Sequence, residues 1–175
     1  MRLFIAINFS SGVRSRLLAL QGELRAKSAR GSFTLPENLH LTLAFLGECD
    51  REQLASAKAA VDAVSFEPFS INIDHVGYFR RCDGNIWWAG VRESRPLLVL
   101  QSQLTERLIS EDFALDGRKY SPHITLGRKV ERDIDPWEIE PFDETVASIE
   151  LMKSERIQGK LTYTEVHRKA AVQHD

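Results

Sequence analysis

The sequence predicts an α+β chain built of two similar lobes that face one another across a polar cleft. Three observations lead to this prediction. Strand-like and helix-like segments alternate along the 175 residues, a weak repeat recurs at the spacing from His40 to His123, and each copy carries the tetrad His-apolar-Thr-apolar. With 43% hydrophobic and 27% charged residues, the chain has the composition of a globular protein with a core. We therefore expect residues 1–175 to form a single domain made of two lobes.

Hydrophobic periodicity separates the elements of the first half. A nearly continuous apolar run is typical of a central strand, and apolar residues at three- and four-residue steps indicate the buried face of a helix. Ser10-Ser11 offers an N-cap for the first helix, and Pro68 follows the second. In order, these signals predict a strand over 2–8, a helix that ends near residue 30, a strand over 39–45, a helix over 52–64 and a strand over 69–76.

The second half repeats much of this order. A polar turn over 80–85 precedes an aromatic strand over 86–91, and Pro96 marks the start of a helix with leucines on one face. A basic loop then leads into a strand over 123–127. Beyond it we expect a connection rich in acidic residues as far as Pro141, followed by a hairpin of strands 145–154 and 160–166 around Gln158-Gly159.

Composition and charge exclude several classes of protein. A net charge of −2 argues against a broad electrostatic grip on a long nucleic acid, which requires many uncompensated Lys and Arg residues. Cys49 and Cys82 form neither a disulfide framework nor a zinc motif, and the acidic residues show no metal-ligand spacing. The apolar N-terminus is short and is expected to form a strand rather than a signal peptide. We expect a cytoplasmic protein that uses no metal or cofactor.

An internal repeat relates the two halves. A step of 83 residues, the spacing from His40 to His123, carries the strand 2–8 onto 85–91 and Leu17 onto Leu100. The order strand, helix, loop and His-x-Thr strand therefore occurs twice, although the second copy has no counterpart of the helix 52–64. This order suggests two lobes related by an approximate two-fold axis.

The two tetrads, His40-Leu-Thr-Leu and His123-Ile-Thr-Leu, carry the candidate chemistry. Because successive side chains of a strand point to opposite faces, the apolar residues belong in the core under a helix, whereas each His shares the other face with its Thr. One strand histidine is more often structural than catalytic. Two copies in register with an internal repeat favour function, since a two-fold axis would bring both histidines and both threonines to one place.

Two imidazoles and two hydroxyls suit phosphodiester cleavage without a metal. One histidine can take a proton from an attacking water while the other protonates the departing oxygen, because the ordinary histidine pKa lies near neutral pH. Each threonine hydroxyl can donate a hydrogen bond to a non-bridging phosphate oxygen, where negative charge grows in the transition state.

The chain resembles a known family at these residues and beyond them. The two tetrads match the paired HxTx signature of the 2H phosphoesterase superfamily. The segments "RLFIAI", "PENLHLTLAFLGE", "WWAGV" and "SPHITLGR" are similar to the RNA 2',3'-cyclic phosphodiesterases, long called 2'-5' RNA ligases. The resemblance implies two antiparallel sheets that line a central cleft with helices outside. It also implies metal-independent hydrolysis of RNA 2',3'-cyclic phosphate ends to 2'-phosphate ends.

The resemblance also assigns roles to residues. It implies that His40 is the proton donor and His123 the proton acceptor, and that Thr42 and Thr125 bind phosphate oxygens. Arg128 matches an arginine common after the second motif in this family. Simple alternation places Arg128 on the face opposite His123, so it can bind phosphate only if the strand ends or bulges at Gly127.

Other residues have competing interpretations. Trp87 and Trp88 point to opposite faces of one strand, so at least one is expected in the core while the other is a candidate for stacking on a base. Alternation places Phe45 in the core. It also puts His75 on the apolar face of its strand, where a structural role is the better interpretation.

Three functions stay open from the sequence. The first is the RNA-end phosphodiesterase, in a family whose members include some that join tRNA halves reversibly through a 2'-5' linkage. The second is a 2H phosphodiesterase acting on ADP-ribose cyclic phosphate or on 2'-5' oligonucleotides. The third is a non-catalytic module that binds RNA ends, although binding alone does not need two proton-transfer groups. Expected partners are RNA ends or small cyclic nucleotides, with no membrane, and the chain is expected to be a monomer.

Overall fold

Two antiparallel sheets and three α-helices form the computed structural model, which describes residues 1–131 and 133–174. The first sheet has the strand order β3-β1-β8-β9 and the second has the order β2-β6-β5-β4-β7. The predicted α+β class with two antiparallel sheets is confirmed. The strands of the first sheet are β1 (Arg2–Asn8), β3 (His40–Glu48), β8 (Ser148–Ile157) and β9 (Lys160–Ala170). Those of the second are β2 (Ser32–Phe33), β4 (Phe69–Phe79), β5 (Asn85–Val91), β6 (His123–Val130) and β7 (Trp137–Val146).

Each of the three helices begins at a residue whose side chain caps it. The Ser10 hydroxyl accepts a hydrogen bond from the Val13 amide at the start of α1 (Ser11–Lys27). Asp50 and Gln53 form a reciprocal capping box at α2 (Arg51–Ala63). The Ser94 hydroxyl caps α3 (Arg95–Ser110), which carries a proline in its first turn.

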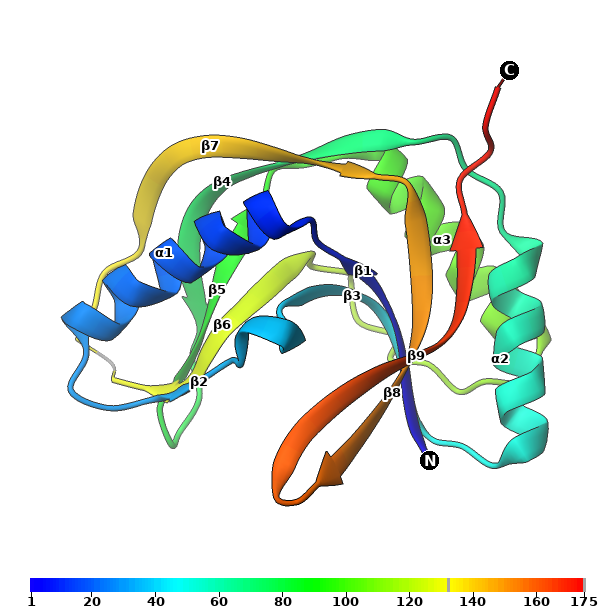
Figure 1. The fold of residues 1–175 in the computed structure, drawn as a ribbon, viewed down its shortest axis with the longest axis horizontal. Coiled ribbons are helices and arrows are strands. Elements are labelled where there is room, and N and C mark those ends of the chain that lie inside the picture. The colour runs from blue at the N-terminus through cyan, green and yellow to red at the C-terminus, as the bar shows by residue number, and fades with distance from the viewer. Residues whose placement is uncertain (132, 175) are drawn as a thin grey trace.

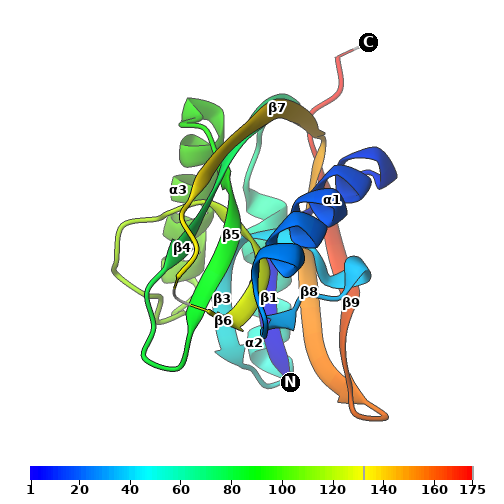
Figure 2. The ribbon, with the colours of Figure 1, turned by 90° about the vertical axis from the view of Figure 1, so that its left-hand side faces the viewer.

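Helices α1 and α3 each follow a strand of one sheet and pack against strands of the other sheet. Although α1 follows β1 of the first sheet, it packs against β6 and β7 of the second, and Figure 1 shows it lying across that sheet. Helix α3 follows β5 of the second sheet but contacts β3 as well as β4, and α2 packs against α3, β8 and β9. Figure 2 shows α1 and α3 on opposite sides of the molecule. One continuous core therefore contains buried side chains from both sheets and all three helices.

The strand pairing supports the predicted repeat and corrects its step by one residue. In the first sheet Asn8 of β1 lies opposite His40 of β3, and in the second sheet Gly90 of β5 lies opposite His123 of β6. Asn8 therefore corresponds to Gly90, whereas a step of 83 residues would have matched it to Val91. The two histidines occupy the same place in two equivalent strand pairs.

The region before Pro141 differs from the prediction. Residues 137–146 form β7, an edge strand paired with β4, where an acid-rich connection was expected. Acidic residues and proline are depleted in strands in general, but an edge strand tolerates both, because one side of it faces solvent. Pro141 lies where the pairing of β7 with β4 shifts register. Among the described residues, no helix is long and apolar enough to cross a membrane.

Candidate active site

The candidate site lies on the face of the two sheets that carries His40 and Thr42 on β3 and His123 and Thr125 on β6, which we call the site face. Strands β3 and β6 contact one another although they belong to different sheets. As predicted, Leu41, Leu43, Ile124 and Leu126 are buried on the opposite face, and the four polar side chains are only partly buried. Alternation along each strand therefore separates the core from the site face.

Each motif histidine is held through the same ring nitrogen. His40 Nδ1 lies 2.7 Å from the carbonyl oxygen of Asn38, and His123 Nδ1 lies 2.7 Å from that of Ser121. A carbonyl oxygen can only accept, so Nδ1 carries a proton in both rings and Nε2 is the atom that titrates. His40 Nε2 lies 2.8 Å from the Thr42 hydroxyl. The two copies of the motif thus fix the same tautomer and leave Nε2 available for proton transfer.

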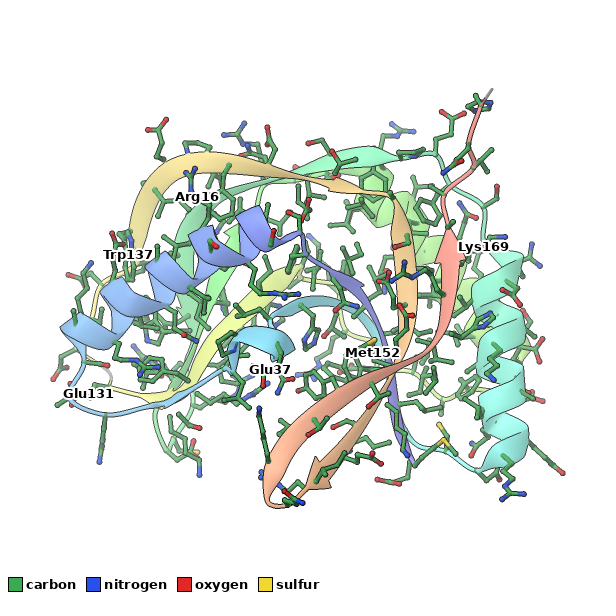
Figure 3. The ribbon with its side chains drawn as sticks, viewed as in Figure 1. Arg16, Glu37, Glu131, Trp137, Met152 and Lys169 are labelled. Carbon is green, nitrogen blue, oxygen red and sulfur yellow. The ribbon has the colours of Figure 1, made fainter. Side chains whose placement is uncertain are left out.

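Aromatic rings support both imidazoles. The His40 ring centroid lies 4.9 Å from Phe4 and 5.3 Å from Tyr163. Phe4 also packs with Met152, which Figure 3 labels on β8. The His123 ring centroid lies 4.9 Å from Phe79, in an edge-on arrangement. These contacts limit the rotation of each ring and bury part of it.

Burial and neighbouring charges lower the pKa of both histidines. Burial is the main reason that the pKa of His40 lies below 6.5, and positive charges on His123 and Arg128 lower it further against the hydrogen bond to Asn38. Burial likewise lowers the pKa of His123, and Arg128 adds to the effect against the hydrogen bond to Ser121. His123 and Arg128 are therefore close enough to His40 to act on it electrostatically, and protonation of one imidazole disfavours protonation of the other.

A bulge in β6 places Arg128 on the site face. Thr125 lies opposite Trp88 and Gly127 lies opposite Trp87, so Leu126 is the extra residue in the pairing with β5. The bulged carbonyl of Leu126 accepts hydrogen bonds from the Gln21 side-chain amide at 2.9 Å and from the Thr34 amide at 3.0 Å. Strand β6 therefore bulges next to Gly127, which is what Arg128 needs in order to reach the site face.

The same bulge occurs in β3 and makes the prediction for Phe45 wrong. Ala6 lies opposite Thr42 and Ile5 lies opposite Ala44, so Leu43 is the extra residue. The bulge reverses the alternation, and the Phe45 side chain is 68% exposed beside Phe4 instead of in the core. Phe45 and Arg128 each follow their motif histidine by five residues and reach the site face by the same device.

The tandem tryptophans divide as their alternation predicts. Trp87 is 0% exposed and packs between Tyr78 and Trp137, with ring centroids 5.0 and 5.7 Å away. It has no surface on which a base could stack, which excludes it as a stacking residue. Trp88 lies on the site face, 6.4 Å from the His123 ring, and stays the candidate for base stacking.

The interpretation of His75 as a residue of the apolar face is wrong. The pairing of β4 shifts between Ile73 and His75 on both of its sides. Ile73 and Val76 are therefore both buried in the core, and His75 lies on the site face with its ring 5.5 Å from Trp88. A bulge at Asp74 carries this third imidazole onto the same face as His123.

Two residues that position the motifs have no signal in the sequence. The Tyr120 hydroxyl, on the loop before β6, donates a 2.7 Å hydrogen bond to the Thr42 carbonyl of β3 and so ties one motif to the other. The Asn38 carbonyl accepts the hydrogen bond from His40, and the Asn38 side-chain amide donates a 2.9 Å hydrogen bond to the Leu161 carbonyl. Glu37 beside it, labelled in Figure 3, pairs with Lys160 of the β8–β9 hairpin. Only long-range contacts reveal these roles.

Among the described residues, no group of three or more His, Cys, Asp or Glu side chains is arranged to hold a metal ion. The groups available for chemistry on the site face are imidazoles, hydroxyls and Arg128. They can bind an anion, accept a proton and donate a proton.

The chain is similar to a set of proteins with one described activity. The family model described as LigT like Phosphoesterase matches residues 7–88. The RNA 2',3'-cyclic phosphodiesterase of Archaeoglobus fulgidus is 35% identical over 129 residues, which cover 73% of this chain and 72% of that protein. The RNA 2',3'-cyclic phosphodiesterase of Escherichia coli is 28% identical over 177 residues and covers 98% of this chain and 97% of its own length.

Solved structures agree with these relatives over nearly the whole chain. The crystal structure of E. coli LigT complexed with 3'-AMP covers 98% of both chains at 27% identity, with a TM-score of 0.82. The crystal structure of a protein from Thermus thermophilus covers 97% of both chains at 28% identity, with a TM-score of 0.84. With the paired HxTx strands, these similarities show that the chain belongs to the LigT-like phosphoesterase family of the 2H superfamily.

Proposed function

We propose that this protein hydrolyses 2',3'-cyclic phosphate ends of RNA to 2'-phosphate ends by general acid–base catalysis between His40 and His123. One observation carries the proposal. Both imidazoles are fixed through Nδ1 to a backbone carbonyl, at equivalent places in two strand pairs, which leaves both Nε2 atoms for proton transfer. The names of the relatives supply the class of substrate.

The proposed reaction is one displacement at phosphorus. His123 Nε2 accepts a proton from water as the water oxygen bonds to phosphorus, and the bond from phosphorus to O3' breaks. His40, protonated at Nε2, donates its proton to the departing O3', which leaves the phosphate on O2'. One proton is taken up and one is released, so the enzyme ends with the two protonation states exchanged and returns to its starting state through solvent.

Three further groups act on the phosphate in this proposal. The hydroxyls of Thr42 and Thr125 donate hydrogen bonds to non-bridging oxygens, and Arg128 supplies a positive charge where negative charge develops. The Thr42 hydroxyl lies 2.8 Å from His40 Nε2, which supports a role for it beside the proposed proton donor. Since an RNA 5'-hydroxyl can replace the attacking water, the same site would also join two RNA ends through a 2'-5' linkage, reversibly and without ATP.

The test is hydrolysis of adenosine 2',3'-cyclic phosphate by His40→Ala and His123→Ala. Each variant should lose about 10²- to 10⁴-fold in kcat, the usual contribution of a positioned acid or base. Product analysis should give the 2'-phosphate, and EDTA should leave the rate unchanged. His174→Ala, which removes an exposed histidine paired with Glu67 near the C-terminus, is the matched control and should behave like the wild type.

Several outcomes would overturn the proposal. Full activity in either motif variant would remove that histidine from the chemistry. A 3'-phosphate product would mean that the leaving oxygen is O2' and that the donor faces the other side of the ring. Tight binding of product without turnover would instead make the protein a module that binds RNA ends.

A further inference from the structure

A third histidine on the site face belongs to a charged cluster that the proposed reaction does not use. The Asp74 carboxylate lies between an imidazole and a guanidinium: its Oδ1 is 2.6 Å from His75 Nδ1 and its Oδ2 is 3.0 Å from Arg92 Nε. Burial of Asp74 acts to raise its pKa, but the hydrogen bonds from His75 and Arg92 outweigh burial and hold the pKa below its usual range. Asp74 is therefore ionised and fixes Nδ1 of His75 as the protonated nitrogen, as the carbonyls do for His40 and His123.

The cluster presents its nitrogen-bearing side chains outward. The Asp74 side chain is 20% exposed, whereas His75 is 40% and Arg92 is 59% exposed. Solvent therefore meets the imidazole and guanidinium nitrogens more than the carboxylate oxygens. An exposed guanidinium beside an imidazole suits an anion, and the carboxylate that orients both is largely withdrawn from solvent.

The His75 ring is directed toward the strand that separates it from His123. Gly90 of β5 lies opposite His75 on one side and opposite His123 on the other. A Cβ atom at Gly90 would come within 2.2 Å of His75 Cε1 and Nε2, so the ring lies directly over the glycine backbone. Only glycine at this position leaves room for the ring on the floor of the site face.

The separation of the two imidazoles is limited by the strands and by Trp88. His75 and His123 flank one strand, so their backbones are two strand spacings apart, about 9.5 Å. Both rings approach the same Trp88 ring, His75 at 5.5 Å and His123 at 6.4 Å between centroids. The centroids of the two imidazoles are therefore no farther apart than the sum of these two distances. A phosphate bound near His123 and a second anion bound near His75 would therefore lie close enough to belong to neighbouring positions of a single RNA strand.

We propose that the Asp74–His75–Arg92 cluster binds the phosphate on the 5' side of the terminal nucleotide, so that the protein acts on the ends of RNA chains in preference to free cyclic mononucleotides. The inference rests on the proposed function and names its class of substrate. Two observations carry it together: the outward-facing imidazole and guanidinium on the site face, and the glycine that lets the His75 ring lie toward His123.

A matched pair of small substrates tests the proposal. Adenosine 2',3'-cyclic phosphate and its 5'-phosphorylated form differ only in the phosphate that the cluster would bind. The wild type should show a kcat/KM about tenfold higher for the 5'-phosphorylated form, the effect of about one charge-assisted hydrogen bond. His75→Gln should remove this preference and leave hydrolysis of the unphosphorylated substrate within about twofold of the wild type. Asp74→Asn should reduce the preference.

A control and a binding measurement separate this inference from the proposed reaction. His167→Gln removes another imidazole that pairs with a carboxylate, that of Asp62 in α2, and it should keep the full preference. Calorimetric titration should show that the wild type binds adenosine 2',5'-bisphosphate about tenfold more tightly than adenosine 2'-phosphate, and that His75→Gln binds them equally.

Each result has one meaning. Equal kcat/KM values for the two substrates in the wild type, or a preference that survives in His75→Gln, would overturn the inference while the proposed hydrolysis stands. If the wild type hydrolyses neither substrate but binds the bisphosphate more tightly and loses this in His75→Gln, the subsite stands and the proposed function fails.

Discussion

Arg128→Gln is the perturbation that tests most of the proposed site at once. The substitution keeps a polar side chain on the bulged strand and removes one positive charge. Arg128 is exposed, so the folded state should change little in stability. If its guanidinium binds a non-bridging phosphate oxygen, kcat/KM for adenosine 2',3'-cyclic phosphate should fall about 10- to 100-fold, because a hydrogen bond to a charged group contributes about 1.5–3 kcal/mol.

The same substitution should move the pH profile in a defined direction. The charge of Arg128 lowers the pKa of both His40 and His123, so its removal should raise both values. Both limbs of the profile of kcat/KM should therefore shift to higher pH at low salt, and high salt should reduce the shift because it screens the charge.

Lys129→Gln is the control for this prediction. It removes the same charge from the neighbouring residue, which is also exposed but, unlike Arg128, is not among the charges that lower the pKa of His40 or His123. The assay is initial-rate hydrolysis from about pH 4.5 to about pH 9 in matched buffers. Unchanged rates and limbs in Arg128→Gln, or equal changes in Lys129→Gln, would refute the placement of Arg128 beside the two imidazoles.

Three further predictions test the fold around the site. Phe45→Ala should change the free energy of unfolding by less than about 0.5 kcal/mol in urea denaturation, whereas Leu43→Ala should lower it by about 2–5 kcal/mol. A large loss of stability in Phe45→Ala would place Phe45 in the core. Tyr120→Phe should lower the free energy of unfolding by about 1 kcal/mol and lower kcat more than it raises KM, because it removes the hydrogen bond between the Tyr120 loop and the first motif strand. An unchanged kcat would mean that the tyrosine has only a structural role. Because the pKa values of His40 and His123 are lowered in the folded state, the unfolded chain takes up protons at higher pH than the folded chain does. The free energy of unfolding should therefore fall as the pH drops below 6.5 toward the folded-state pKa values. A variant with glutamine at both positions should show a shallower fall with pH, and an equally steep fall would contradict the prediction.

Local signals were sufficient for the elements that depend on local physics. The cap at Ser10, the proline at Pro96 and the apolar stripes predict the three helices, because capping and periodicity act within one segment. The paired His-x-Thr strands predict the candidate site, since alternation over three residues needs no partner strand. These parts of the fold could be obtained from the sequence alone.

The two errors in assigning side chains to a face share one cause, which is alternation continued across a bulge. Phe45 and His75 were each assigned a face by counting from apolar neighbours, and in each case an extra residue in the strand reverses the count. Arg128 reaches the site for the same reason. A bulge depends on the register of the partner strand and on long-range support such as the Gln21 amide under β6, neither of which appears in a local pattern.

The two bulges also bear on how a repeated site can carry out a directional reaction. A two-fold repeat supplies two equivalent imidazoles, but the proposed reaction needs one protonated and one neutral at the same time. Mutual repulsion favours the singly protonated pair, because a charge on His123 lowers the pKa of His40. Repulsion cannot choose which ring holds the proton. At matching positions after the motifs, the bulges bring Phe45 to the site face on one strand and Arg128 on the other, so the surroundings are unequal where a phosphate would bind. The shared backbone geometry thus places both imidazoles, and in the proposed reaction the divergence of Phe45 and Arg128 would orient the phosphate between them.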